Sequence, residues 1–328
     1  MTNVGRWRYM LGAVVALFLT AFSATPLSVM LSTVASAEDA PVKVTFIIYT
    51  AAGDPFWNPV IHGVEEAAKD RNVAVDIQYA DSDPVKQNNL IETAIANKVD
   101  GIAIVNWIPD AFTANIAKAR AAGIAVITFD TDDPKPNATQ SQAYIGQDFF
   151  AAGQRIATKM IEAGKLKSGD HVVSPVEDPD AFYGVERFRG IKAVLDKAGI
   201  TSERLDASPT MATALTRISQ YLVGHQNTKA IIGLGSVVTE VSPQAAAEAG
   251  VNIPIGGFDL SPGIVDSILA GKMIGTVDSG AYYEGYMPVV MLHYFVKYGV
   301  PPASVPIGGT VIDASNAALV KKWAGTYR

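Results

Sequence analysis

Short apolar runs alternate with helical segments along almost the whole chain after residue 41. In the first half, each run has the length and composition of a buried strand and is followed by apolar residues at helical spacing. The strand-like runs of this half are Val42–Tyr49, Val73–Tyr79, Gly101–Val105 and Ile124–Phe129. A series of strand–helix units of this kind predicts a parallel sheet with helices on both faces.

The same pattern restarts after a proline-rich loop at Asp132–Gln140. A short strand near Ala143–Ile145 precedes the restart, and the strands predicted in the second series are His171–Val176, Ala230–Leu234, Ile255–Phe258 and Gly275–Val277. The fold class predicted is therefore α/β, with two Rossmann-like lobes that each consist of a parallel sheet flanked by helices.

The end of the chain predicts more than one connection between the lobes. A long helix is expected at Tyr282–Tyr298, an irregular or extended stretch at Pro301–Ile312, and a final helix at Asn316–Trp323. We expect an N-terminal lobe of residues 42–146 plus about 280–310, and a C-terminal lobe of 147–279 plus about 311–328. Several crossings between two lobes form a hinge with a ligand cleft between them.

Composition excludes several classes of function. The chain has 328 residues, no cysteine and a formal net charge of −6. An acidic protein is a poor partner for nucleic acid or an anionic membrane surface. The lack of cysteine removes thiol catalysis, disulfides, cysteine-ligated metals and a lipoprotein anchor.

Residues 1–37 have the pattern of a cleaved signal peptide. Arg6 and Arg8 form a positive end, Met10–Phe22 is an apolar stretch, and Ala35-Ser36-Ala37 is a small-residue cleavage site. The alternative is an uncleaved membrane anchor, but polar residues and Pro26 interrupt the apolar run. We therefore expect an exported, soluble, monomeric protein of the periplasm, without membrane insertion after cleavage.

Motifs for catalysis, cofactors and metals are not found in the sequence. The stretch Gly233-Leu234-Gly235 begins a dinucleotide-like pattern, but the third glycine is missing because Val238 takes its place. The histidines are scattered, without metal-ligand spacing, at His62, His171, His225 and His293. The sequence predicts no enzyme activity, no cofactor and no metal site.

Polar residues stand where several predicted strands end, and the carboxyl ends of parallel strands share one edge of a sheet. These residues are Asn106, Asp130, Asp259 and Asp278. Phe56 and Trp57 follow the first strand in the same way, after the turn at Asp54. Helix capping would explain any one of the acids, and core packing would explain the aromatic pair. Their combination favours a ligand cleft.

The chemistry of these side chains suits a sugar or another neutral polyol. Carboxylates and amides pair with hydroxyl groups, and flat rings cover the apolar face of a sugar ring. Tyr183 and Arg187 follow a turn in the second half, and the guanidinium would add a planar fork of donors. The alternative role for Arg187 is a surface salt bridge with a neighbour such as Glu186.

Five short motifs, taken in order, carry a resemblance to a known family. They are D-P-F-W at 54–57, V-I-T-F-D at 126–130, E-R-F-R-G at 186–190, G-G-F-D at 256–259 and G-T-V-D at 275–278. With them, residues 42–315 resemble the periplasmic sugar-binding proteins of ABC importers, in the branch with ribose- and galactose-binding proteins. The resemblance implies the type I periplasmic binding protein fold, three hinge crossings, and a monosaccharide or polyol enclosed between the lobes.

The resemblance also implies a set of binding residues. By position in the motifs these are Asp54, Phe56 and Trp57 of the first loop, the acid Asp130, the arginine Arg187, the acid Asp259, and Asp278 or Ser279 on the hinge side. The chain departs from the pattern at two places. Thr131, which we also predict as a ligand-binding residue, stands where ribose binders have an arginine, and Gly235-Ser236 replaces a frequent Asn-Asp pair. The identity of the ligand is therefore not carried over.

The function predicted is capture of the sugar or polyol and its delivery to an ABC transporter permease. The same fold also serves as a ligand sensor for a chemoreceptor or sensor kinase, and the sequence does not separate these two. A repressor would need a DNA-binding helix pair where the signal peptide stands. An exported α/β enzyme would need a nucleophile, metal or cofactor motif.

Overall fold

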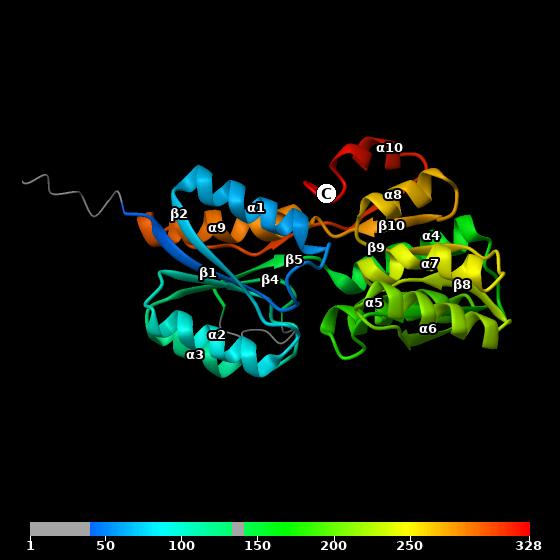
Figure 1. The fold of residues 1–328 in the computed structure, drawn as a ribbon, viewed down its shortest axis with the longest axis horizontal. Coiled ribbons are helices and arrows are strands. Elements are labelled where there is room, and N and C mark those ends of the chain that lie inside the picture. Colours follow the sequence, from blue (N-terminus) through cyan, green and yellow to red (C-terminus); the bar gives the residue numbers. More distant parts are fainter. Residues whose placement is uncertain (1–39, 133–140) are drawn as a thin grey trace, which may run out of the picture. The chain divides into compact units, whose positions relative to one another are not determined.

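The computed structural model describes residues 40–132 and 141–328. The predicted signal peptide and its cleavage site, and nearly all of the predicted proline-rich loop, lie outside the described residues. The described part contains two six-stranded sheets with helices packed on them (Figure 1). The predicted α/β class with two sheet-and-helix lobes is confirmed.

The first sheet is parallel throughout, and its strands follow one another in space in an order different from the sequence. The spatial order is β11 (Val305–Pro306), β5 (Ala143–Gly146), β4 (Ala125–Asp130), β3 (Gly101–Ile104), β1 (Val42–Ile48) and β2 (Val73–Tyr79). The chain changes direction across the sheet between β1 and β3. Ligands of open α/β sheets bind at such switch points, outside the carboxyl ends of the strands.

Two pairs of helices cover the two faces of this sheet (Figure 1). One face carries α1 (Trp57–Arg71) and α9 (Ala281–Tyr298), and the other carries α2 (Pro84–Ala96) and α3 (Thr113–Ala121). Nearly every residue of β1 is buried, as expected for a central strand covered on both faces.

The second sheet repeats this arrangement, except that its edge strand β12 runs antiparallel to β10. The spatial order is β12 (Thr310–Asp313), β10 (Gly275–Asp278), β9 (Ile255–Phe258), β8 (Thr228–Ile232), β6 (His171–Val176) and β7 (Thr201–Asp206). The helices of this half are α4 (Phe149–Gly164), α5 (Phe182–Lys197), α6 (Met211–Gly224), α7 (Ser236–Glu248), α8 (Pro262–Leu269), α10 (Ala317–Val320) and the 3₁₀ turn η1 (Lys321–Trp323).

Helices α4 and α5 pack through two glycines, and this packing positions the second half of the site. A Cβ atom at Gly153 would collide with the backbone carbonyl of Arg187, and one at Gly190 would collide with that of Phe150. Only glycine allows the two backbones to approach so closely. The close approach sets the place of Arg187 against the end of the sheet.

The chain passes between the two sheets at three places, and hydrogen bonds join these crossings. The carbonyl of Asp278 accepts from Gln147 Nε2 at 3.2 Å and from the backbone N–H of Gly309 at 2.8 Å. The N–H of Ile307 donates to the carbonyl of Gly146 at 3.0 Å. The crossings after β5, β10 and β11 are thereby connected to one another.

The structure differs from the predicted elements in a few places. Strand β7 was not predicted, because it is an edge strand of mostly exposed polar residues without an apolar run. Apolar residues at helical spacing in the sequence place the starts of three helices at Val60, Val185 and Val241. In the structure these helices, α1, α5 and α7, begin earlier, at Trp57, Phe182 and Ser236. None of these three helices has a side-chain cap at its first residue, so the usual sequence signal for a helix start is missing.

The end of the chain is also more regular than predicted. The stretch predicted as irregular or extended contains β11 and β12, and the predicted last helix divides into α10 and η1. Within the described ranges, none of the helices has both the length and the apolar character that a membrane crossing requires.

Candidate ligand-binding cleft

A cavity of about 180 Å³ lies where the carboxyl ends of strands from both sheets come together. Its lining comes from the segments that follow β1, β4, β6, β8 and β9, and from the first turns of α1, α5 and α7. The cavity has room for a small ligand such as a single ring. The charged residues of the lining are Asp54, Asp130, Glu177, Asp178, Arg187 and Asp259.

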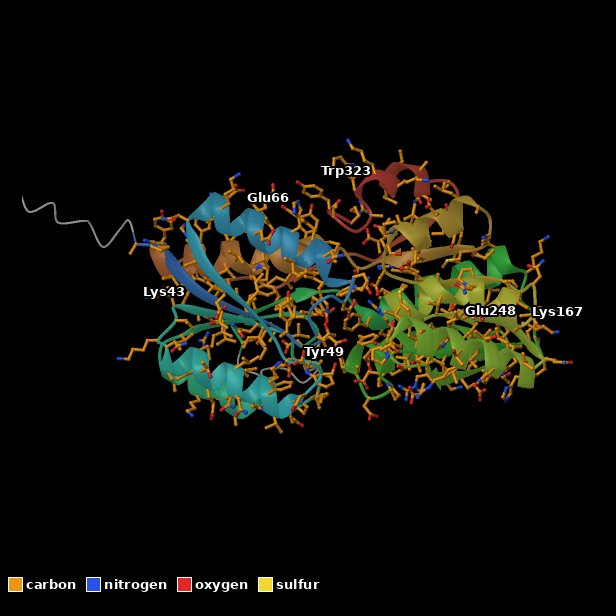
Figure 2. All side chains as sticks on the ribbon, viewed as in Figure 1. Lys43, Tyr49, Glu66, Lys167, Glu248 and Trp323 are labelled. Atoms are coloured by element: carbon orange, nitrogen blue, oxygen red, sulfur yellow. The ribbon has the colours of Figure 1, made fainter. Side chains whose placement is uncertain are left out.

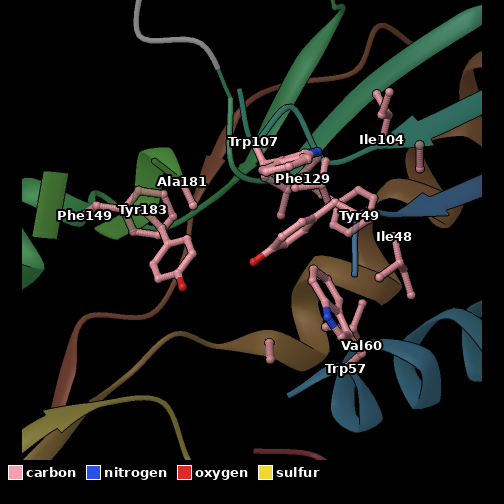
Figure 3. Close-up of a cluster of buried hydrophobic side chains, with 14 of the residues drawn as sticks. Ile48, Tyr49, Trp57, Val60, Ile104, Trp107, Phe129, Phe149, Ala181 and Tyr183 are labelled. Carbon is pink, nitrogen blue, oxygen red and sulfur yellow. The ribbon is translucent and has the colours of Figure 1, made fainter. Parts of the chain in front are cut away.

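Aromatic rings after β1 line one side of the cavity. Figure 2 places Tyr49 at the end of the first sheet that is nearer the second, and Figure 3 shows Tyr49 beside Trp57 and Trp107. Tyr49 stacks on Trp107 with ring centroids 5.1 Å apart, and Trp57 meets Tyr49 edge-on at 5.8 Å. Behind them, Trp107 Nε1 donates to Gln87 Oε1 at 2.9 Å, and Gln87 Nε2 donates to the carbonyl of Val105 at 2.6 Å. Buried hydrogen bonds of this kind hold the rings in fixed positions.

Trp57 belongs both to the hydrophobic core and to the cavity wall. It is 2% exposed and packs in the core cluster, and it also lines the cavity. Its indole N–H lies near Asp54 and lowers the pKa of that carboxyl, but it makes no hydrogen bond of normal geometry. Core packing and ligand binding, the two predicted alternatives for this residue, are therefore compatible with one another.

Asp54 is held by its own turn. Its carboxylate accepts a hydrogen bond from the backbone N–H of Phe56 at 3.1 Å. Burial raises the pKa of Asp54, and the hydrogen bond from Phe56 opposes that rise. The turn thus directs a carboxylate and the ring of Phe56 to the same cavity.

The acids Asp130 and Asp259 end equivalent strands of the two sheets with the same backbone conformation. Both have a positive φ, 57° for Asp130 and 70° for Asp259, which is uncommon for residues other than glycine. A hydroxyl from the neighbouring strand holds each carbonyl. Tyr144 Oη donates to Asp130 O at 2.6 Å, and Thr276 Oγ1 donates to Asp259 O at 2.9 Å. Left-handed conformations persist where surrounding contacts impose them, often at functional sites.

Burial dominates the ionisation of Asp130. It raises the pKa of this carboxyl to about 7, and the charges of Asp259 and Asp54 act in the same direction. The Thr131 hydroxyl, which donates to Asp130 Oδ2 at 2.9 Å, and the charge of Arg187 lower it. Asp130 is therefore a carboxyl that exchanges a proton near neutral pH.

Arg187 is 3% exposed and lies against Asp259. Its Nη1 donates to Asp259 Oδ2 at 3.3 Å and to the carbonyl of Leu234 at 2.8 Å. Its Nη2 donates to Asp259 Oδ1 at 3.4 Å and to Gln147 Oε1 at 3.3 Å. The guanidinium carbon also lies 4.3 Å from the centre of the Phe258 ring, within the range of a cation–π interaction.

The alternative role for Arg187 is wrong, because Glu186 is paired with Arg189 on the exposed side of α5. Burial lowers the pKa of Arg187, but the charges of Asp259 and Asp130 outweigh it, so the pKa is raised overall. The guanidinium is a permanent cation inside the cleft.

The structure brings seven of the eleven predicted site residues together around the cavity: Asp54, Phe56, Trp57, Asp130, Tyr183, Arg187 and Asp259. The other four lie behind the wall. Asn106 Nδ2 donates to Asp132 Oδ1 at 3.2 Å, and Thr131 bonds Asp130. Asp278 accepts from Arg328 Nε at 2.8 Å, and Ser279 hydrogen-bonds the carboxyl of Asp259.

Sequence reasoning missed several buried polar residues of this region. Glu177 follows β6 as the predicted acids follow their strands, so the same strand-end signal would have found it. Gln147 had no such signal, because its role depends on contacts across the hinge. Glu284 is 1% exposed in the first turn of α9. Burial, and after it the charges of Asp130 and Asp259, raise the pKa of Glu284 well above its normal value.

Among the residues that the structure describes, no cluster of acids and histidines could hold a metal ion.

The geometry agrees with comparisons to known proteins. The chain belongs to the periplasmic binding protein domain family, whose sequence profile matches residues 44–299. This confirms the resemblance read from the motifs.

Individual relatives cover most of the chain. The xylose/arabinose-binding protein XylF of Sulfolobus acidocaldarius is 25% identical over 84% of this chain and 71% of its own length. The D-apiose import binding protein of Actinobacillus succinogenes is 25% identical over 92% of this chain and 97% of its own. A solved carbohydrate transporter from Acidothermus cellulolyticus, in complex with myo-inositol, superposes with a TM-score of 0.80 at 27% identity, covering 87% of this chain and 98% of that one.

Proposed function

We propose that this chain is a periplasmic solute-binding protein that encloses one monosaccharide or polyol ring in the cleft and delivers it to an ABC-type permease. The observation that carries the proposal is the lining of the cavity. It combines an aromatic wall with several carboxylates and a single guanidinium, in a volume of one small ring.

The polar groups of the lining match a ligand that is covered with hydroxyls. A hydroxyl group both donates and accepts hydrogen bonds. The carboxylates of Asp54, Asp130 and Asp259 provide acceptors, while Arg187 and the indole N–H of Trp57 provide donors. The rings of Phe56 and Trp57 provide a surface for the apolar face of the ring.

The position of the cavity supports a mechanism of capture by closure. Its lining comes from both sheets, and the three crossings near the cavity are joined by hydrogen bonds. A ligand that contacts both halves stabilises the closed form relative to the open one. Delivery to a permease, and binding rather than catalysis, are supported by the relatives, whose names describe sugar binding and import.

A ligand screen on the purified exported protein tests the proposal. The screen would measure melting temperature with D-xylose, L-arabinose, D-apiose, D-allose and myo-inositol, alongside amino acids and dicarboxylates. A ligand at a thousandfold excess over its Kd adds about 4 kcal/mol of stability, so a true ligand raises the melting temperature clearly. A shift with at least one sugar or polyol is expected.

Tryptophan fluorescence adds a site-specific control. The response to the ligand should disappear in Trp57→Phe, because this indole lines the cavity, and persist in Trp323→Phe, whose indole is 42% exposed outside it. A protein that responds only to amino acids or dicarboxylates would contradict the proposal.

A further inference from the structure

The carboxylate of Glu177 fills a space that Gly235 leaves open. Glu177 follows β6, Gly235 precedes α7, and both line the cavity. A Cβ atom at position 235 would lie only 2.6 Å from Glu177 Oε1. Gly235 has a φ of −149°, which any residue adopts, so its backbone does not require glycine. A side chain at this position would therefore displace the Glu177 carboxylate.

Two hydrogen bonds fix the Glu177 carboxylate. Tyr183 Oη donates to Oε2 at 2.9 Å, and the backbone N–H of Val238 donates to Oε1 at 3.2 Å. Val238 lies in the first turn of α7, whose cap residue Gly235 has no side chain to offer. Glu177 therefore takes the place of a helix N-cap, where a negative charge is favourable.

This capping role does not use up the carboxylate. Burial raises the pKa of Glu177 to about 7, and the hydrogen bonds from Val238 and Tyr183 oppose that rise. When ionised, the carboxylate has about four acceptor positions on its two oxygens, and Tyr183 and Val238 each occupy one of them. Glu177 and its donor Tyr183 both line the cavity. The remaining acceptor positions are available to a ligand.

The charges around Glu177 restrict what that ligand can be. Five carboxyls line the cavity, at Asp54, Asp130, Glu177, Asp178 and Asp259, and Arg187 is the one cation among the lining residues that the structure describes. Arg187 already forms an ion pair with Asp259. A ligand with hydrogen-bond donors finds many acceptors there, whereas an anionic group would be repelled by carboxyls that outnumber the cation of the lining.

We propose that Glu177 is a ligand-binding residue that, in the space left by Gly235, makes the cleft select sugars or polyols whose O–H or N–H groups donate to it and reject anionic sugars. The proposal rests on the proposed function of the same cleft. Hydroxyl and amine groups can both donate a hydrogen bond to the Glu177 carboxylate, and neutral and amine-bearing probes distinguish them.

The test compares Glu177→Gln with the wild type by titration calorimetry. The probes are neutral (D-xylose, D-apiose and myo-inositol), amine-bearing (D-glucosamine) and anionic (D-glucuronate and ribose 5-phosphate). The wild type should bind at least one neutral or amine-bearing probe and neither anion. Glutamine keeps the shape but removes the charge, so affinity for the bound probe should fall about 10- to 100-fold, as expected for loss of a hydrogen bond to a charged group. The ratio of the affinity for neutral probes to the affinity for anionic probes should also fall.

Glu248→Gln is the matched control, because Glu248 is an exposed glutamate of α7 outside the cavity.

A second measurement checks the packing without a ligand. Gly235→Ala should lower the melting temperature of the ligand-free protein, and should lower it less in a Glu177→Ala background, where the carboxylate is gone. Gly224→Ala is the control glycine, because a Cβ atom there would meet nothing within 4 Å. Equal costs of Gly235→Ala in the two backgrounds would contradict the packing argument.

The outcomes separate this inference from the function it rests on. If Glu177→Gln binds the neutral or amine-bearing probe as the wild type does, or weakens every probe equally, the inference is wrong and the proposed function stands. If the wild type binds only anionic probes, the inference and the neutral ligand class are both overturned. If the wild type binds none of the probes, both the proposed function and the inference are wrong.

Discussion

The two halves of the cleft place an aspartate at the end of equivalent strands, but they treat its charge differently. In both, the residue is left-handed and its carbonyl is held by a hydroxyl of the next strand. Asp259 has hydrogen bonds from the guanidinium of Arg187. Asp130 receives its hydrogen bond from the neutral hydroxyl of Thr131 and forms no ion pair with any residue that the structure describes.

The difference indicates a division of roles between the halves. The second half contains the ion pair between Arg187 and Asp259, which holds the guanidinium donors and the carboxylate acceptor in place before a ligand binds. Burial raises the pKa of both aspartates, but the charge and the hydrogen bonds of Arg187 oppose the rise at Asp259. In the first half the pKa of Asp130 is raised to about 7, so its charge receives less stabilisation from the protein alone. Donors from a ligand would stabilise it. We infer that ligand binding changes the surroundings of Asp130 more than those of Asp259.

The largest effect is expected from Arg187→Ala. This change leaves Asp259 as a buried carboxylate without its partner, which typically costs about 3–5 kcal/mol of folding free energy. It also removes the donors that face the ligand, so binding in the screen should fall by at least about 100-fold. Urea unfolding and calorimetry measure the two effects. Arg189→Ala on the same helix is the control, since Arg189 pairs with Glu186 on the exposed side. Wild-type affinity in Arg187→Ala would show that the ion pair is not part of the site.

The second effect separates the two aspartates by their response to pH. A carboxyl whose pKa rises from 3.8 to about 7 on folding contributes stability that is present below about pH 4 and lost as pH rises toward 7. In Asp130→Asn this loss disappears, so the melting temperature of the ligand-free protein should depend less on pH between 5 and 8 than in the wild type. At pH 8 the variant should be at least as stable as the wild type.

Asp259→Asn should behave in the opposite way. It leaves the buried guanidinium of Arg187 without a carboxylate, so it should destabilise the ligand-free protein across the whole pH range. If the two variants gave the same stability at pH 8, the halves would not differ as the structure indicates. Both variants should bind ligand more weakly than the wild type.

Sequence reasoning reached most of this arrangement for physical reasons. The alternation of apolar runs and helices predicted both sheets, and because parallel strands end at one edge, acids after strands pointed to the cleft. Asp130 and Asp259 were found in this way, whereas Arg187 was found from its place after a turn and from the E-R-F-R-G motif. Strand β7 was missed because an exposed edge strand has no apolar run to mark it. The pairing of Glu177 with Gly235, and the place of Gln147 in the hinge, depend on contacts between distant segments that no local pattern records.

The smallest effect should come from the hydroxyls that hold the two left-handed aspartates. Thr276→Val and Tyr144→Phe each remove one donor to a backbone carbonyl, and a bond of this kind contributes about 1 kcal/mol. Thr276 is fully buried, so its loss leaves the carbonyl of Asp259 without a replacement. Tyr144 is partly exposed, so water can take its place beside Asp130. Urea unfolding should therefore show a larger loss for Thr276→Val, and calorimetry a loss of affinity of a few-fold in each. A larger loss of stability for Tyr144→Phe than for Thr276→Val would contradict this order. It would mean that the left-handed backbone at Asp130 depends more on its hydroxyl donor than the backbone at Asp259 does.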